Sequence, residues 1–125
     1  MRILLDTHIL YWWFYETSKL SKNAVAIVQE AEEVFVSSAS VWELAIKSRL
    51  GKINADPQQV LKRIEKNDFI ELPVYFRHAA LVATLPLHHA DPFDRLLIAQ
   101  AISEPLNLLT ADPKLKAYSE LVVQV

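Results

Sequence analysis

The stretch RILLD, residues 2–6, is a short apolar run that ends in an acid. A run of this length and composition predicts a β-strand that is buried on both faces and stops at Asp6. Four later runs have the same character, namely Val34–Val36, Phe69–Leu72, Leu106–Leu109 and Leu121–Val123. We therefore expect five strands.

Segments with the spacing of helices separate these runs: Ser21–Glu32, Ser40–Leu50, Pro57–Lys66, Tyr75–Leu85 and Pro92–Ser103, followed by a short turn from Pro113. Strands that alternate with helices imply right-handed crossovers and a parallel sheet covered on both faces. The predicted fold class is α/β, a three-layer α/β/α sandwich, in a single domain over residues 1–125. No internal repeat is visible.

The composition excludes several classes of protein. The 125 residues include 52% hydrophobic residues and no cysteine, so disulfides, thiolate metal sites and thiol nucleophiles are all absent. The lack of cysteine suits a reducing cytosol, and we expect a cytoplasmic protein. The longest apolar run, Ile9–Tyr15, is far shorter than the roughly 20 residues of a membrane helix.

A formal net charge of -2 argues against a broad basic face that binds nucleic acid without regard to sequence. A nucleic-acid substrate would need local help from metal ions that neutralise its phosphates, or from a few basic side chains, namely Lys47, Arg49, Lys52 and Arg95.

Four acids map to one edge of the predicted sheet. Asp6 ends the first strand, Asp112 follows the fourth, and Glu43 lies in the opening turn of the helix after the second. Asp94 opens the Pro92–Ser103 helix, whose start should lie on the same side. In an open parallel sheet, ligands bind beyond the carboxyl ends of the strands, so these acids should converge.

Each acid also has an ordinary structural explanation. Acids favour the first turn of a helix, and proline favours its first position. Helix starts of this kind would account for Asp6, Asp91, Asp94 and Asp112, while Glu43 fits a capping box with Ser40 and an ion pair with Lys47. For any single acid we favour this explanation.

For the four together, repulsion reverses the preference. Two carboxylates about 5 Å apart repel by roughly 3 kcal/mol at an effective dielectric constant near 20. Divalent cations would compensate such a cluster, and an all-oxygen site suits Mg²⁺ or Mn²⁺ better than zinc. We predict hydrolysis of a phosphodiester by a metal-activated water.

Four segments of the chain resemble the PIN-domain family, and more narrowly the VapC-type toxins of bacterial toxin-antitoxin pairs. These segments are LLDTH at 4–8 with the following Trp12 and Trp13, SASVWELAIK at 38–47 running to LGK at 50–52, HADPFDRLLIAQA at 89–101, and LTAD at 109–112. Each is moderately specific, and their common order makes the resemblance strong over nearly the whole chain.

The resemblance implies a parallel sheet in the order 3-2-1-4-5, an endoribonuclease that depends on Mg²⁺ or Mn²⁺, a cognate antitoxin and, as VapC-like proteins are commonly dimeric, a homodimer. It implies that the acidic positions are Asp6, Glu43, Asp94 and Asp112, with Asp6 and Asp94 foremost among the direct metal ligands. It places hydroxyls that could support metal-bound waters at Thr7, Ser38 and Thr110. Only one of Asp91 and Asp94 can take the third acidic position; the match over Leu96–Ala101 favours Asp94, and leaves Asp91 as an N-cap.

Other conspicuous side chains receive no role in the site. No histidine pair has zinc spacing, so surface or loop positions are expected for His8, His78, His88 and His89. The aromatic run at Trp12, Trp13 and Phe14 is too long for every ring to face the core, and one ring could lie at an interface.

Two rival functions remain open on sequence alone. Aspartate-based phosphotransfer enzymes also place an aspartate after a strand, but haloacid-dehalogenase-like proteins need a second one where His8 stands, and receiver domains need a lysine where this chain has Thr110-Ala111-Asp112. A non-catalytic PIN-like module that only binds a partner is the other rival. Retention of all four acids argues against it.

Overall fold

A computed structural model describes residues 1–125 and contains one five-stranded parallel sheet in the order β3-β2-β1-β4-β5. The strands are β1 (Arg2–Leu5), β2 (Glu33–Ser37), β3 (Ile70–Leu72), β4 (Asn107–Thr110) and β5 (Val122–Gln124). All five predicted strands are present, each within two residues of its expected bounds. The predicted fold class and strand order are confirmed.

The connections between strands are helical. They comprise α1 (Thr7–Tyr15), η1 (Thr17–Lys19), α2 (Lys22–Glu30), α3 (Ser38–Arg49), α4 (Pro57–Lys66), α5 (Phe76–Val82), α6 (Pro92–Ser103) and η2 (Pro113–Tyr118). The bounds of α4 and α6 agree with the prediction, because a proline preceded by aspartate marks both starts. No helix is long and apolar enough to cross a membrane.

Helix α3 starts two residues earlier than predicted. Ser37 is its N-cap, and the Ser37 hydroxyl accepts a hydrogen bond from the Ala39 N–H at 3.0 Å. The predicted capping box at Ser40 is therefore wrong. The helix ends before Gly51, the one glycine of the chain, whose φ of +73° continues the backbone in a conformation that side-chain-bearing residues rarely adopt.

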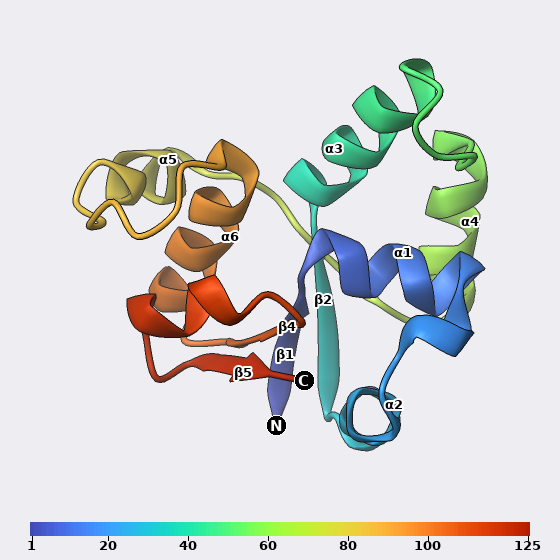
Figure 1. Ribbon diagram of the computed structural model, residues 1–125, viewed down its shortest axis with the longest axis horizontal. Helices are drawn as coiled ribbons and strands as arrows, with labels where there is room; N and C mark the ends of the chain where they lie inside the picture. Colours follow the sequence, from blue (N-terminus) through green and yellow to red (C-terminus); the bar gives the residue numbers. More distant parts are fainter.

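The central strand β1 alternates between two apolar clusters. Ile3 and Leu5 pack with residues of α1, α2, α3 and α4, whereas Leu4 packs with Leu97 and Ile98 of α6 on the other face. Figure 1 shows α5 and α6 on one side of β1 and β2, with α1 and α4 on the other. Burial on both faces explains why these strands read as continuous apolar runs.

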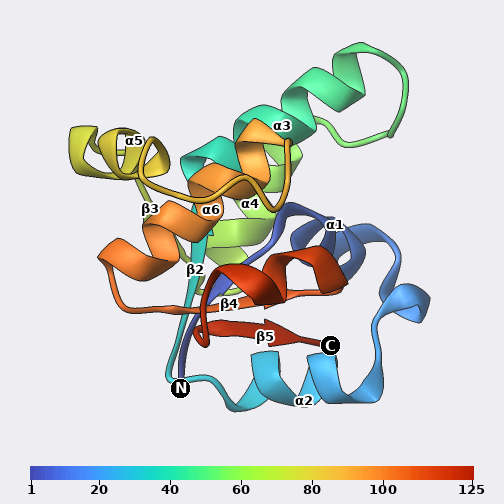
Figure 2. The ribbon, with the colours of Figure 1, turned by 60° about the vertical axis from the view of Figure 1, so that its left-hand side comes forward.

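The carboxyl ends of the strands meet at one edge of the sheet because all four pairings are parallel. At this edge the Asp6 N–H donates to the Leu109 carbonyl at 3.0 Å, which ties the end of β1 to β4. Helices α3 and α6 contact one another above the same edge, as Figure 2 shows. These elements carry the predicted acids.

Candidate active site

Asp6 lies directly after β1 and is 2% exposed. It occupies the N-cap position of α1, but its side chain makes no cap hydrogen bond. Its Oδ2 accepts a hydrogen bond of 2.6 Å from the Thr110 hydroxyl, and its Oδ1 is buried without a partner. The capping explanation therefore does not account for this carboxylate.

Glu43 lies in the second turn of α3 and is also buried. Its Oε2 is 2.9 Å from the Lys47 ammonium, which confirms the expected ion pair. Its Oε1 is buried without a hydrogen-bond partner. A buried carboxylate oxygen without a partner costs free energy, so two such oxygens in one region indicate a missing cation or donor.

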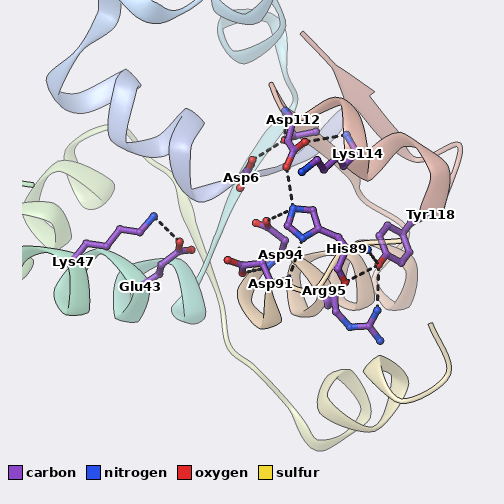
Figure 3. A network of polar contacts seen from close by, with 11 residues as sticks. Asp6, Glu43, Lys47, His89, Asp91, Asp94, Arg95, Asp112, Lys114 and Tyr118 are labelled. Carbon is purple, nitrogen blue, oxygen red and sulfur yellow. Dashed lines mark hydrogen bonds and ion pairs between the residues drawn. The ribbon is translucent and has the colours of Figure 1, made fainter. Parts of the chain in front are cut away.

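Asp94 and Asp112 both start a helix. The Asp91 side chain accepts from the Asp94 N–H at 3.0 Å, so Asp91 is the N-cap of α6 and Asp94 lies in the first turn. Asp112 caps η2 through its Oδ1, which accepts from the Lys114 N–H at 2.9 Å. The capping predictions are thus confirmed for Asp91 and Asp112, while the Asp112 Oδ2 is directed toward Asp94 and His89 (Figure 3).

His89 joins this group, although the sequence analysis assigned it no role in the site. Its Nε2 is 3.4 Å from Asp94 Oδ2 and 3.2 Å from Asp112 Oδ2. The three ligand atoms lie within 4.8 Å of one another. The signal available in the sequence was position: His89 stands two residues before the N-cap of α6, where a loop side chain can reach back over the helix start.

Two of the three predicted hydroxyls lie against site residues. Thr110 donates to Asp6 and also accepts from the Asp112 N–H at 3.0 Å, and Thr7 donates to Ser40 at 2.9 Å in a buried contact next to Asp6. Ser38 is engaged elsewhere, because its hydroxyl accepts from the Val74 N–H at 3.2 Å and it lines an apolar groove between α3 and α4.

Two of the four basic residues considered for phosphate contact, Arg95 and Lys47, have other partners. Arg95 donates to the carbonyls of Val82, Leu85 and Pro86 and to the Tyr118 hydroxyl, so it holds the segment between α5 and α6. Lys47 pairs with Glu43. Its ammonium therefore offsets a charge of the site itself, and the site has little basic charge to spare for a substrate.

The remaining histidines differ from expectation in one case. His78 is fully buried, with its Nε2 at 2.7 Å from Glu104, so the expected surface or loop position is wrong for this residue. Among the aromatic residues after Asp6, Phe14 is buried, while Trp12 and Trp13 are half-buried against the core.

The charge of the acidic cluster is poorly compensated. Burial, followed by repulsion from Asp6, Asp91, Glu43 and Asp112, raises the pKa of Asp94 to about 8. Burial also raises the pKa of Asp6, against the hydrogen bond from Thr110 that lowers it. These carboxylates resist ionisation because burial and mutual repulsion disfavour their charged form. A hard divalent cation would offset that charge and would bind their oxygen atoms.

A hollow of about 250 Å³ opens beside the acids. Asp6 and Asp112 line it together with His8, Trp12 and Ala111. The rings of His8 and Trp12 lie 5.9 Å apart and are tilted by 50°. The hollow therefore combines two carboxylates with two aromatic walls.

A comparison with protein families identifies this arrangement, because the model of the PIN domain matches residues 3–121. The chain belongs to the PIN domain family. The family resemblance seen in the sequence is confirmed. Ribonuclease VapC22 of Mycobacterium tuberculosis (strain ATCC 25618 / H37Rv) is 33% identical to this PIN domain over 122 residues, covering 93% of this chain and 91% of the relative.

Solved structures share the PIN fold at lower identity. VapBC2 from Rickettsia felis, solved bound to a DNA fragment from its promoter, superposes with a TM-score of 0.74 at 17% identity, covering 100% of this chain and 98% of the other. A toxin-antitoxin complex from Klebsiella pneumoniae gives a TM-score of 0.68 at 20% identity, with 98% and 96% coverage. At these identities the likeness concerns the fold alone.

Proposed function

We propose that this PIN domain is a Mg²⁺- or Mn²⁺-dependent endoribonuclease and the toxin of a toxin-antitoxin pair. The observation that carries the proposal is the edge-of-sheet group of Asp6, Glu43, Asp94 and Asp112, two of whose members hold buried oxygens without partners. Identity of 33% to a ribonuclease over most of both chains supports RNA as the substrate.

The chain's own residues would hold the cation. The unpartnered Asp6 Oδ1 and Glu43 Oε1 and the carboxylate of Asp94 supply oxygen donors, and no cysteine competes for a softer metal. A divalent cation at such a site supplies an acidified water as nucleophile and positive charge for the departing oxygen of a phosphodiester. Thr110 and Lys47 orient the carboxylates of Asp6 and Glu43, so little reorganisation is required on binding.

The hollow beside Asp6 would receive the substrate. Single-stranded RNA offers unstacked bases that pack against aromatic rings, and Trp12 and His8 supply such rings next to two of the acids. A net charge of -2 and the engagement of Lys47 and Arg95 fit local neutralisation of phosphate by metal better than attraction by a basic face. We propose the cytoplasm as the site of this activity.

The proposed partners are a cognate antitoxin and a second copy of the chain. Structural neighbours described as toxin-antitoxin complexes support the first.

For the homodimer, Trp42 on α3 is 63% exposed and packs edge-on against Phe93 of α6 at 5.2 Å, and Phe76 on α5 is almost fully exposed. Apolar rings in such positions are commonly covered in a complex. We expect Trp42→Glu to yield monomers in light scattering.

Cleavage of a single-stranded RNA by the purified protein tests the activity. Asp6→Asn should abolish Mg²⁺- or Mn²⁺-dependent cleavage and leave the thermal melting curve near that of wild type. Asp91→Ser is the matched control, because it keeps an N-cap on α6 and should retain cleavage. Full activity of Asp6→Asn, or a stable aspartyl-phosphate after incubation with a phosphodonor, would contradict the proposal.

Growth of a bacterial host tests the toxin role separately. Expression of the wild-type chain should arrest growth, and co-expression of its cognate antitoxin should relieve the arrest. Asp6→Asn should not arrest growth at equal expression. Relief by an unrelated small protein would argue against a cognate pair.

A further inference from the structure

The tautomer of His89 follows from its contacts. The Asp91 N–H donates to His89 Nδ1 at 3.0 Å, so this nitrogen accepts a hydrogen bond and carries no proton. The proton of the neutral ring is therefore on Nε2, the atom that lies 3.4 Å from Asp94 Oδ2 and 3.2 Å from Asp112 Oδ2. An Nε2–H in this place donates to Asp112 Oδ2, lies beside Asp94 Oδ2, and has no lone pair to offer a cation.

Two further contacts fix the His89 backbone, and a third holds the hydroxyl that makes them. The Tyr118 hydroxyl accepts from the His89 N–H at 2.8 Å and lies 3.3 Å from the His89 carbonyl oxygen. Arg95 donates to the same hydroxyl at 3.1 Å. Figure 3 shows His89 between Asp112 and Asp94, with Tyr118 and Arg95 on its far side. Residues from η2 and α6 thus clamp a loop residue in one orientation.

From this geometry we infer that His89 is a positioning residue, whose Nε2–H holds the carboxylates of Asp94 and Asp112 side by side, and that it is not a ligand of the metal. The inference rests on the proposed function, since it concerns the same site. Its physical basis is the repulsion between neighbouring carboxylates, which grows as the distance between them falls. An N–H that donates to Asp112 and lies beside Asp94 opposes the separation of these carboxylates.

Asp112 needs such a partner more than the other acids. Its side chain is 31% exposed, against 17% for Asp94, and its Oδ1 is committed to the cap of η2. Only Oδ2 remains to face the site, and His89 is the side chain that fixes its direction. Groups that orient metal-binding carboxylates typically contribute tenfold or more to metal affinity.

The test measures Mn²⁺ binding by calorimetry and the electron spin echo modulation of bound Mn²⁺. We expect His89→Ala to raise the Kd for Mn²⁺ by about tenfold. His89→Gln, which keeps a side-chain N–H at similar reach, should recover most of that loss. His88→Ala removes the neighbouring exposed imidazole and should leave the Kd unchanged. The wild-type spectrum should lack the modulation of a directly coordinated imidazole ¹⁴N.

Each outcome of these measurements either supports or overturns the role inferred for His89. An imidazole ¹⁴N signal in the wild type that disappears in a folded His89→Ala variant would make His89 a ligand and overturn the inference. The absence of this signal from the wild type supports the inference and needs no variant. An unchanged Kd in His89→Ala, or no recovery in a folded His89→Gln, would also overturn it. If Asp6→Asn loses cleavage while His89→Ala keeps its Mn²⁺ affinity, only this inference fails; if Asp6→Asn still cleaves RNA, the proposed function fails.

Discussion

The Thr110 hydroxyl donates a 2.6 Å hydrogen bond to Asp6 Oδ2, joining the ends of two neighbouring strands that lie 104 residues apart in the chain. Both residues are fully or almost fully buried. The same hydroxyl accepts from the Asp112 N–H, so one side chain fixes parts of two acidic residues. The site is thus built into the edge of the sheet itself.

Replacing Thr110 by valine should therefore affect both stability and metal binding. The variant keeps the shape of the side chain but leaves Asp6 with two unpartnered buried oxygens, which costs about 1–3 kcal/mol of unfolding free energy. Urea unfolding in the presence of EDTA measures this loss. Thr110→Ser retains the hydroxyl and is the control. Equal stability of the valine and serine variants would show that the hydrogen bond contributes nothing.

The stability of the protein should fall as the pH rises when divalent metal is removed. The pKa of Asp94 is about 8 in the folded state, whereas its ordinary value, which applies to the unfolded chain, is 3.8. At a pH between these two values, the folded state therefore holds a proton that the unfolded state has lost. The unfolding free energy in EDTA should therefore decrease by a few kcal/mol between about pH 5 and about pH 8.

Two comparisons assign this pH dependence to the acidic cluster. Asp94→Asn removes the titrating group and should flatten the stability profile. Mn²⁺ should raise the stability of the wild type most at the higher pH, because cations bind the deprotonated carboxylates. A wild-type stability that is constant with pH in EDTA would contradict the raised pKa of Asp94.

Most of the fold could be predicted from the sequence because its local and global signals agree. Apolar runs buried on both faces predicted the strands, and Asp-Pro pairs predicted the starts of α4 and α6. The start of α3 was missed because Ser37, Ser38 and Ser40 all suit an N-cap, and only the end of β2 selects Ser37. The strand order came from the family resemblance.

The site was harder to predict than the fold. The positions of the four acids at strand ends and helix starts predicted their convergence, which depends on topology alone. The role of His89 depends on where the irregular segment between α5 and α6 folds back, and its contacts to Asp91 and Tyr118 leave no periodic signal. His78 was misjudged for a similar reason, since its partner Glu104 is 26 residues away.

The contact between His78 and Glu104 supports a prediction outside the site. His78 is fully buried, its Nδ1 accepts from the Tyr75 N–H, and its Nε2–H donates to Glu104 at 2.7 Å. Glu104→Ala leaves this N–H unpaired and should cost about 1–3 kcal/mol in urea unfolding at neutral pH. Glu104→Gln keeps an acceptor and should lose less.

The cost of Glu104→Ala should shrink in acid. The hydrogen bond from His78, with help from Arg77, lowers the pKa of Glu104 from 4.5 to about 2. The charged carboxylate makes its full contribution to the unfolding free energy above pH 4.5, and this contribution is lost as the pH falls toward about 2. The unfolding free energies of Glu104→Ala and Glu104→Gln should differ less from that of the wild type near pH 3 than at neutral pH. A cost that stays constant would assign the effect to packing.

Trp12 provides a test of how RNA reaches the acids. It lines the hollow beside Asp6 and Asp112, so Trp12→Ala should remove a surface on which a base stacks. Stacking of about 1–3 kcal/mol per base corresponds to a rise in KM of roughly fivefold to a hundredfold, with kcat little changed, because Trp12 holds no metal. Trp12→Phe keeps an aromatic ring and should restore most of the affinity. Since Trp12 also packs against the core, melting curves must show that both variants fold. Equal loss in kcat and no recovery with phenylalanine would mean that Trp12 supports the position of α1 and Asp6 instead of the substrate.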